Sequence, residues 1–209
     1  MMIDPTTLMT YVAIVSGFVF IPGPATLLTV ARATSSGTKV GIATGAGIAA
    51  GDVIHTSMAV VGISAIIAAS AILFSIIKYI GAAYLVYLGI QSLLGKTPAN
   101  LVTCILPISA GKAFRQAILA EILNPKTALF FLAFLPQFVR PGNGPVMMQL
   151  TLLGIVFVLL GLVSTVVFAV SAGGLGNFLR RNRTVLKWQG KVVGGLYCAL
   201  GIRLALEER

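Results

Sequence analysis

The sequence predicts an all-α polytopic membrane protein with six transmembrane helices, arranged as a 3+3 inverted repeat in which helices 1 and 4 are broken. Three observations predict this fold. First, 57% of the 209 residues are hydrophobic and only 10% are charged, unlike a soluble domain. Second, apolar runs long enough to cross a bilayer follow one another along the chain. Third, a proline motif interrupts one long run in each half, Pro22-Gly23-Pro24 in the first and Asn124-Pro125-Lys126 in the second.

The first span, residues 7–33, is longer than the roughly 20 residues that a membrane helix needs. A proline inside a helix lacks the backbone donor and clashes with the preceding turn. We therefore expect a break, with Gly23 at the N-cap and Pro24 at the first position of a new half-helix. A simple structural kink is the alternative.

The second span, residues 40–66, has small and polar residues on one face. At about 100° per residue, one narrow stripe contains Gly41, Gly45, Asp52, His55 and Ala59. Such a face packs closely against another helix or lines a cavity. The third span is expected to run from residue 78 to residue 95. Residues 64–77 contain no proline or glycine, so the end of the second span is left open.

The second half repeats this organisation after a connector at residues 97–112, which contains two prolines. Its spans are expected at residues 113–139, 146–172 and 188–206. The first of these carries Glu121 and the second proline motif, in which Asn124 suits an N-cap and Pro125 the first helical position. Residues 1–96 and 113–209 are then two three-helix repeats of one membrane domain, residues 1–209.

An alignment of the halves indicates an internal repeat. Residues 23–28 align with 124–129, and residues 88–90 align with 200–202. Because each half has an odd number of spans, the second half must enter the membrane upside down relative to the first.

Basic residues predict the orientation. The connectors after spans 1, 3 and 5, with their margins, hold ten basic residues: Arg32, Lys39, Lys96, Lys112, Arg115, Arg180, Arg181, Arg183, Lys187 and Lys191. That side should be cytoplasmic, with both termini outside. The formal net charge of +10 then favours anionic membrane lipids as partners, and nucleic acid is not expected.

Charged residues within the spans predict a site near the middle of the membrane. Half-helices that begin at Pro24 and Pro125 would direct their amino ends at a shared centre and favour a carboxylate. Lys126 adds a cation at a depth where it needs a partner. Asp52 either pairs with Lys126 in the empty site or receives a substrate ammonium. A proton exchanged at Asp52, Glu121 or His55 would couple the movement of substrate to a proton gradient.

Other functional classes of membrane protein are less well supported than a transporter. An intramembrane enzyme would need a nucleophile with a base, or a metal cluster. The chain has one histidine, and Cys104 and Cys198 have no metal-ligand spacing, so no metal and no cofactor are expected. His55 can equally be a packing residue, and Lys126 with Asp52 a structural pair. A channel or a structural membrane protein remains an alternative.

The motifs resemble the lysine exporter superfamily, and within it the homoserine/threonine resistance-type amino-acid efflux proteins. The resemblance covers nearly the whole chain. It rests on Pro22-Gly23-Pro24, on the glycine-rich residues 41–51 followed by Asp52 and His55, and on residues 78–90 and 124–138. Two residues depart from the family pattern: Ala25, where an acid or amide is common, and Glu121, where no acid is expected.

The resemblance implies a single membrane transport domain that exports amino acids across the bacterial inner membrane by proton antiport. Neutral substrates similar to homoserine, threonine or leucine are expected rather than basic ones. Partners are the amino acid, protons and membrane lipids, and a homo-oligomer is left open. Residues expected to bind or pass the substrate are Pro22, Gly23, Pro24, Ala25, Gly45, Asp52, Asn124, Pro125 and Lys126.

Overall fold

The structure is a computed structural model that describes residues 3–21, 23–69, 71–94 and 106–181, with short helical pieces at 191, 194–195, 198–199, 201–202 and 205–206. Helices make up almost all of these ranges, and no strand occurs within them. The predicted sixth span, residues 188–206, therefore lies largely outside the described residues.

The first predicted break is confirmed. Helix α1 runs over Pro5–Phe20 and α2 over Pro24–Ser36, and their axes differ by 49°. Gly23 is the N-cap of α2 and Pro24 its first residue, as expected. Pro22 lies outside the described residues. Gly37 ends α2 with a φ of 92°, which glycine adopts without steric cost, and the next helix follows at once.

The boundary expected for the third span is wrong. Helix α3 covers Thr38–Ala69 and α4 covers Ala71–Leu93, so α4 begins well before residue 78. The apolar residues 71–77 contain nothing that ends a helix. They extend α4 instead of forming a separate connector.

The second predicted break is also confirmed. Helix α5 spans Ala110–Ile122 and α6 spans Pro125–Leu129, and the bend between their arms is 47°. Asn124 caps α6 by accepting a hydrogen bond from the N–H of Lys126 at 3.1 Å. The chain continues as a π-helix, η2 (Phe130–Phe134), and a 3₁₀ helix, η3 (Leu135–Phe138). The second half-helix is therefore less regular than the first.

Helix α7 is long and uninterrupted. After a short 3₁₀ turn, η4 (Pro141–Asn143), it runs over Val146–Arg181, and its segment Val146–Ala172 has the length and composition of a membrane span. The two bent pairs, α1 with α2 and α5 with the α6 to η3 segment, meet the same criterion when each is taken as one span. Up to three spans are thus recognised in the described residues, and the six-span inverted repeat stays a prediction.

Glycines bring α3 close to its neighbours α5 and α7. A Cβ on Gly51 would lie 2.6 Å from Cβ of Glu121 in α5, and one on Gly45 would lie 2.6 Å from Oγ1 of Thr165 in α7. No larger residue fits at either place without displacing the partner helix. Gly45, which belongs to the predicted stripe, and Gly51, which lies outside it, therefore both pack helices, as expected for small residues in membrane proteins.

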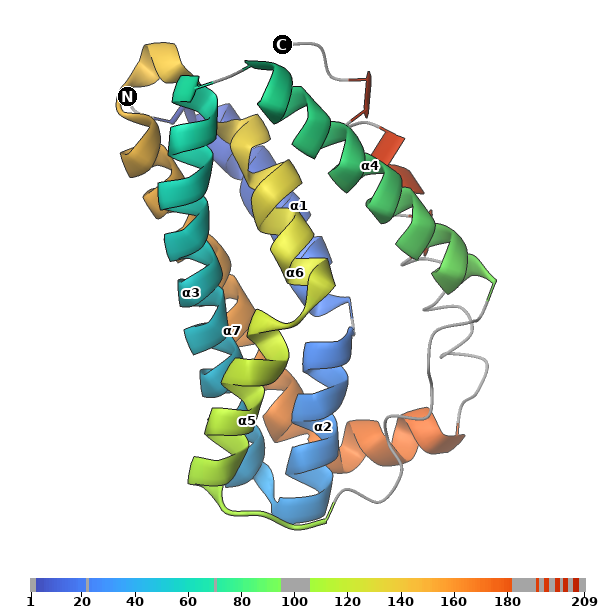
Figure 1. Ribbon diagram of the computed structural model, residues 1–209. Helices are drawn as coiled ribbons and strands as arrows, with labels where there is room; N and C mark the ends of the chain where they lie inside the picture. The colour runs from blue at the N-terminus through green and yellow to red at the C-terminus, as the bar shows by residue number, and fades with distance from the viewer. Residues whose placement is uncertain are drawn as a thin grey trace.

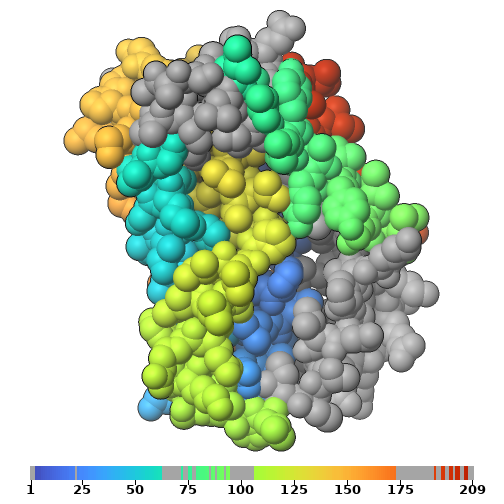
Figure 2. Space-filling view, viewed as in Figure 1, coloured from blue at the N-terminus to red at the C-terminus, as the bar shows by residue number. Residues whose placement is uncertain are grey.

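The two interrupted helices lie next to each other with their breaks at the same level (Figure 1). From the break, α2 continues toward one end of the molecule and α6 toward the other, so the amino ends of both half-helices meet near the middle. In the space-filling view, α3, α4, α5 and α6 share one face, and α2 lies partly behind α5 (Figure 2). This arrangement places the two proline motifs in one region.

Candidate functional site

A cavity of about 50 Å³ lies between the two breaks. Its walls come from both halves: Phe18, Val19, Ile21 and residues 23–26 around the first break, parts of α3 and α7, and the α5–α6 junction. The volume is enough for about three to five water molecules. Among the predicted site residues, those that line it are Gly23, Pro24, Ala25, Asp52, Glu121, Asn124 and Lys126.

The amino ends of α2 and α6 differ in how their backbone donors are satisfied. Gly23 has no side chain that could accept a hydrogen bond, so the first N–H groups of α2 find no acceptor on their N-cap residue. In α6, the Asn124 side chain takes the N–H of Lys126. Helical backbone continues from both amino ends, over Pro24–Ser36 in α2 and over Pro125–Phe138 from α6 to η3, so both helix dipoles act at the cavity.

Asp52 is a buried acid with an unused oxygen. It projects from α3, is 3% exposed, and lines the cavity. Its Oδ1 has no hydrogen-bond partner within the part of the chain that the structure describes. A Cβ added at Gly161 of α7 would lie 3.3 Å from Oδ2. A buried polar atom left unpaired is costly, so this carboxyl group is suited to receive a proton or a cationic ligand.

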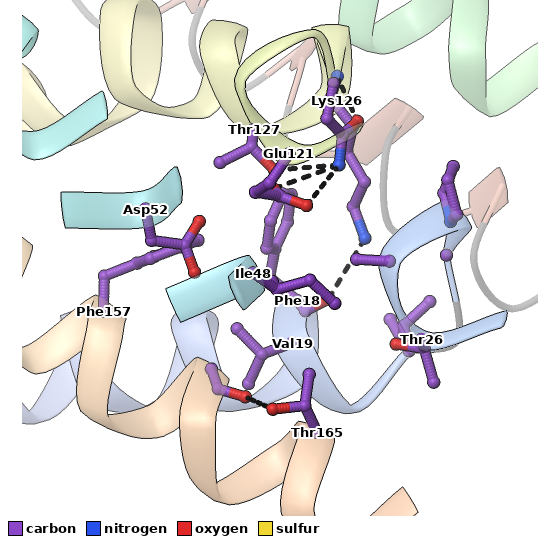
Figure 3. Close-up of a pocket in the computed structure, with 16 residues that line it drawn as sticks. Phe18, Val19, Thr26, Ile48, Asp52, Glu121, Lys126, Thr127, Phe157 and Thr165 are labelled. Carbon is purple, nitrogen blue, oxygen red and sulfur yellow. Dashed lines mark hydrogen bonds between the residues drawn. The ribbon is translucent and has the colours of Figure 1, made fainter. Parts of the chain in front are cut away.

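Lys126 lies on the other side of the cavity from Asp52 (Figure 3). Its Nζ donates a hydrogen bond to the main-chain oxygen of Phe18 at 3.3 Å and lies 4.1 Å from the centroid of the Phe18 ring. The Lys126 side chain thus extends from the second break, where its backbone lies, to the first break, where its ammonium binds. An ion pair between Lys126 and Asp52 stays a prediction.

Glu121 is buried, but its carboxylate is engaged. Asn124 donates from Nδ2 to both carboxylate oxygens, at 3.2 and 3.3 Å, and the Thr127 hydroxyl donates to Oε1. Asn124 also donates to Oγ1 of Thr127 at 3.1 Å. Glu121 therefore acts as an acceptor that ties the end of α5 to the first turn of α6.

His55 contacts the main chain of the same junction. Its Nε2 lies 2.9 Å from the main-chain oxygen of Glu121, and because a carbonyl oxygen only accepts, Nε2 carries the proton. The ring stacks on Phe131 with centroids 5.8 Å apart. His55 does not line the cavity, and this placement favours the packing interpretation over a proton relay.

Two further predicted residues lie beside the cavity without lining it. Gly45 contacts Thr165 as described above, and Pro125 starts α6. Their positions suit helix packing and helix initiation.

Several residues of the cavity wall were not predicted: Phe18, Thr26, Thr127, Phe157 and Thr165. The repeat contained a signal for two of them, since the alignment pairs Thr26 with Thr127, and both line the cavity. The aromatic residues could not be singled out, because Phe18 and Phe157 lie within apolar runs that mainly build the core.

Comparison with known proteins gives a consistent picture. The family model described as LysE type translocator matches residues 16–208. An uncharacterised membrane protein of Bacillus subtilis is 34% identical, covering 96% of this chain and 99% of its own length. One of Vibrio cholerae is 32% identical, covering 90% and 91%. A homoserine/homoserine lactone efflux protein of Salmonella typhimurium is 30% identical, covering 88% of each chain. No solved structure shows a significant match.

Proposed function

Because this chain belongs to the LysE type translocator family, we propose that it is a secondary active exporter of amino acids or their close derivatives. Family membership makes it a transporter and not an enzyme. The name of the Salmonella typhimurium relative, homoserine/homoserine lactone efflux protein, supports small neutral substrates.

The observation that carries the proposal is the Asp52 oxygen that has no hydrogen-bond partner among the described residues, in a cavity that Lys126 also lines. A zwitterion has one charge for each side of such a site. Its ammonium would bind Asp52, and its carboxylate would bind between Lys126 and the amino end of α2. The Lys126 ammonium and the positive end of the α2 dipole both attract an anion. The substrate carboxylate is therefore favourable between them.

The same geometry favours neutral over basic substrates. A basic amino acid brings a second cation and needs a second free acid in the site. The other carboxylate of the cavity, Glu121, is already bonded to Asn124 and Thr127. The remaining wall has apolar side chains, such as Phe157 and Ile48, and threonine hydroxyls, which suit a short apolar or hydroxylated side chain.

Proton antiport follows from competition at Asp52. A carboxyl group in low-dielectric surroundings binds either a proton or a cation. If the group releases the substrate ammonium when it takes up a proton, each proton that enters allows one substrate to leave. We place the protein in the bacterial inner membrane as a 3+3 inverted repeat, with the connectors after spans 1, 3 and 5 in the cytoplasm.

The test is a competition assay in proteoliposomes that contain the purified protein. A labelled neutral amino acid such as homoserine is loaded inside, and its release is followed with and without a pH gradient. Unlabelled neutral amino acids should compete for the site, and lysine should not. Substrate turnover without net movement would contradict the proposal.

Dissipating the pH gradient with a protonophore separates an antiporter from a channel. Release against a concentration gradient should stop in an antiporter. A channel passes substrate only down its own gradient, whether or not protons can move. Equal fluxes with and without the protonophore would support the channel alternative.

A further inference from the structure

The carboxyl end of α1 presents main-chain carbonyl groups at the break. A helix leaves its last four carbonyl oxygens without intrahelical donors, and the negative end of its dipole lies there. The N–H of Ile21 bonds the oxygen of Gly17 at 3.2 Å. No basic residue lies in the last turn of α1. The carbonyl groups that follow Gly17 therefore need donors from another part of the molecule.

Two side chains from the second half of the chain supply these donors. Nζ of Lys126 donates to the oxygen of Phe18 at 3.3 Å, and Oγ of Ser164 in α7 donates to the oxygen of Val19 at 2.8 Å. The Lys126 ammonium also lies 4.1 Å from the Phe18 ring centroid. A helix carboxyl end, a carbonyl oxygen and an aromatic face all attract a cation.

Gly23 leaves the space that the lysine needs. A Cβ at this position would lie 3.1 Å from Nζ of Lys126 and 3.6 Å from its Cδ. The Lys126 side chain therefore passes across the break between α1 and α2, where a residue larger than glycine would force its ammonium to shift by a few tenths of an ångström.

Interrupted helices in sodium-coupled transporters use such carbonyl groups to bind the coupling ion. We propose that Lys126 is a resident cation at the α1 break, occupying the position that a sodium ion takes in those proteins, so that export needs protons but no sodium. The sodium independence rests on the proposed transport function. The cation position rests on the contacts of Lys126 alone.

Two substitutions of Lys126 test the cation position by thermal unfolding of the purified protein. Lys126→Ala removes the charge and leaves space, whereas Lys126→Met removes the charge and fills the space. Both should lower the Tm by on the order of 5 °C, as expected for a lost charged hydrogen bond. Methylammonium should restore most of this loss in Lys126→Ala and none in Lys126→Met.

Ser164→Ala is the matched control, because it removes an uncharged donor from the neighbouring carbonyl group. Its Tm should fall without any recovery in methylammonium. An unchanged Tm in Lys126→Ala would overturn the proposal. So would equal responses of the two Lys126 variants to methylammonium, or a Lys126→Ala protein that does not fold even with methylammonium present.

Flux measurements test the sodium independence. Replacing sodium by potassium should leave the flux of the unmodified protein unchanged, and a sodium requirement would overturn the proposal. In Lys126→Ala, flux should fall about tenfold or more. If the unmodified protein moves no amino acid, the proposed function fails, while the unfolding experiments still decide the cation position.

Discussion

Asp52 and Glu121 are two buried acids of one cavity with different surroundings, and substitution should separate their roles. Asp52→Asn can neither take up a proton nor neutralise an ammonium. We expect the flux driven by a pH gradient to fall about a hundredfold or more, with the protein still present in the membrane. Proteoliposome flux and the amount of protein in the membrane are the two measurements.

Glu121→Gln is the matched comparison. The amide oxygen of glutamine can still accept from Asn124 and Thr127, the two donors that Glu121 uses. This variant should therefore keep its dependence on the pH gradient, even where its maximal flux is lower. If Glu121→Gln loses gradient dependence and Asp52→Asn keeps it, the proton is carried by Glu121.

The different roles of the two acids could not be read from the sequence. Both acids occur within apolar runs, and both were candidates for proton coupling. Asn124 and Thr127 distinguish them, because their donors meet Glu121 only when the chain turns at the break. The same turn determines the place of Lys126, whose partner Phe18 is 108 residues away in sequence.

At the scale of the helices, the glycines of α3 should differ according to what faces them. Gly51→Ala would place a Cβ 2.6 Å from Cβ of Glu121, and overpacking of this kind costs about 1–3 kcal/mol. Gly62 in the same helix has nothing within 4 Å of an added Cβ. Gly62→Ala should therefore be stabilising by up to about 1 kcal/mol. Thermal unfolding of both variants checks this, and an equal effect would contradict the packing role of Gly51.

Local signals predicted the breaks well and the helix boundaries less well. Asn, Gly and Pro at the two motifs act within one turn, so Gly23 and Asn124 were correctly placed as N-caps. The start of α4 at Ala71 was missed because residues 64–77 contain no local stop signal. The sequence contains no local signal for the π-helix η2 either. Its phenylalanines pack into a core formed with α1 and α7, and these contacts come from distant parts of the chain.

For the whole molecule, the orientation in the membrane is open to a direct test. Figure 1 places the link between α2 and α3 at one end of the molecule and η4 at the other. Lys39 and Asn143 are exposed at these ends. In a variant without native cysteines, a membrane-impermeant thiol reagent added outside the inner membrane should label Asn143→Cys and not Lys39→Cys. The reverse pattern would contradict a cytoplasmic position for the basic connectors.

The close contacts of α3 also limit how the site can open alternately to the two sides of the membrane. Helices that meet through glycine have little freedom to slide or rotate against each other, because any shift brings backbone into backbone. A Cβ on Gly41 of α3 would lie only 2.5 Å from Cβ of Ala33 in α2, so we expect α2, α3, α5 and α7 to behave as a fixed frame during the transport cycle. Motion is then left to the segments on the other side of the two breaks, α1 and the α6 to η3 segment, with the proline motifs as hinges.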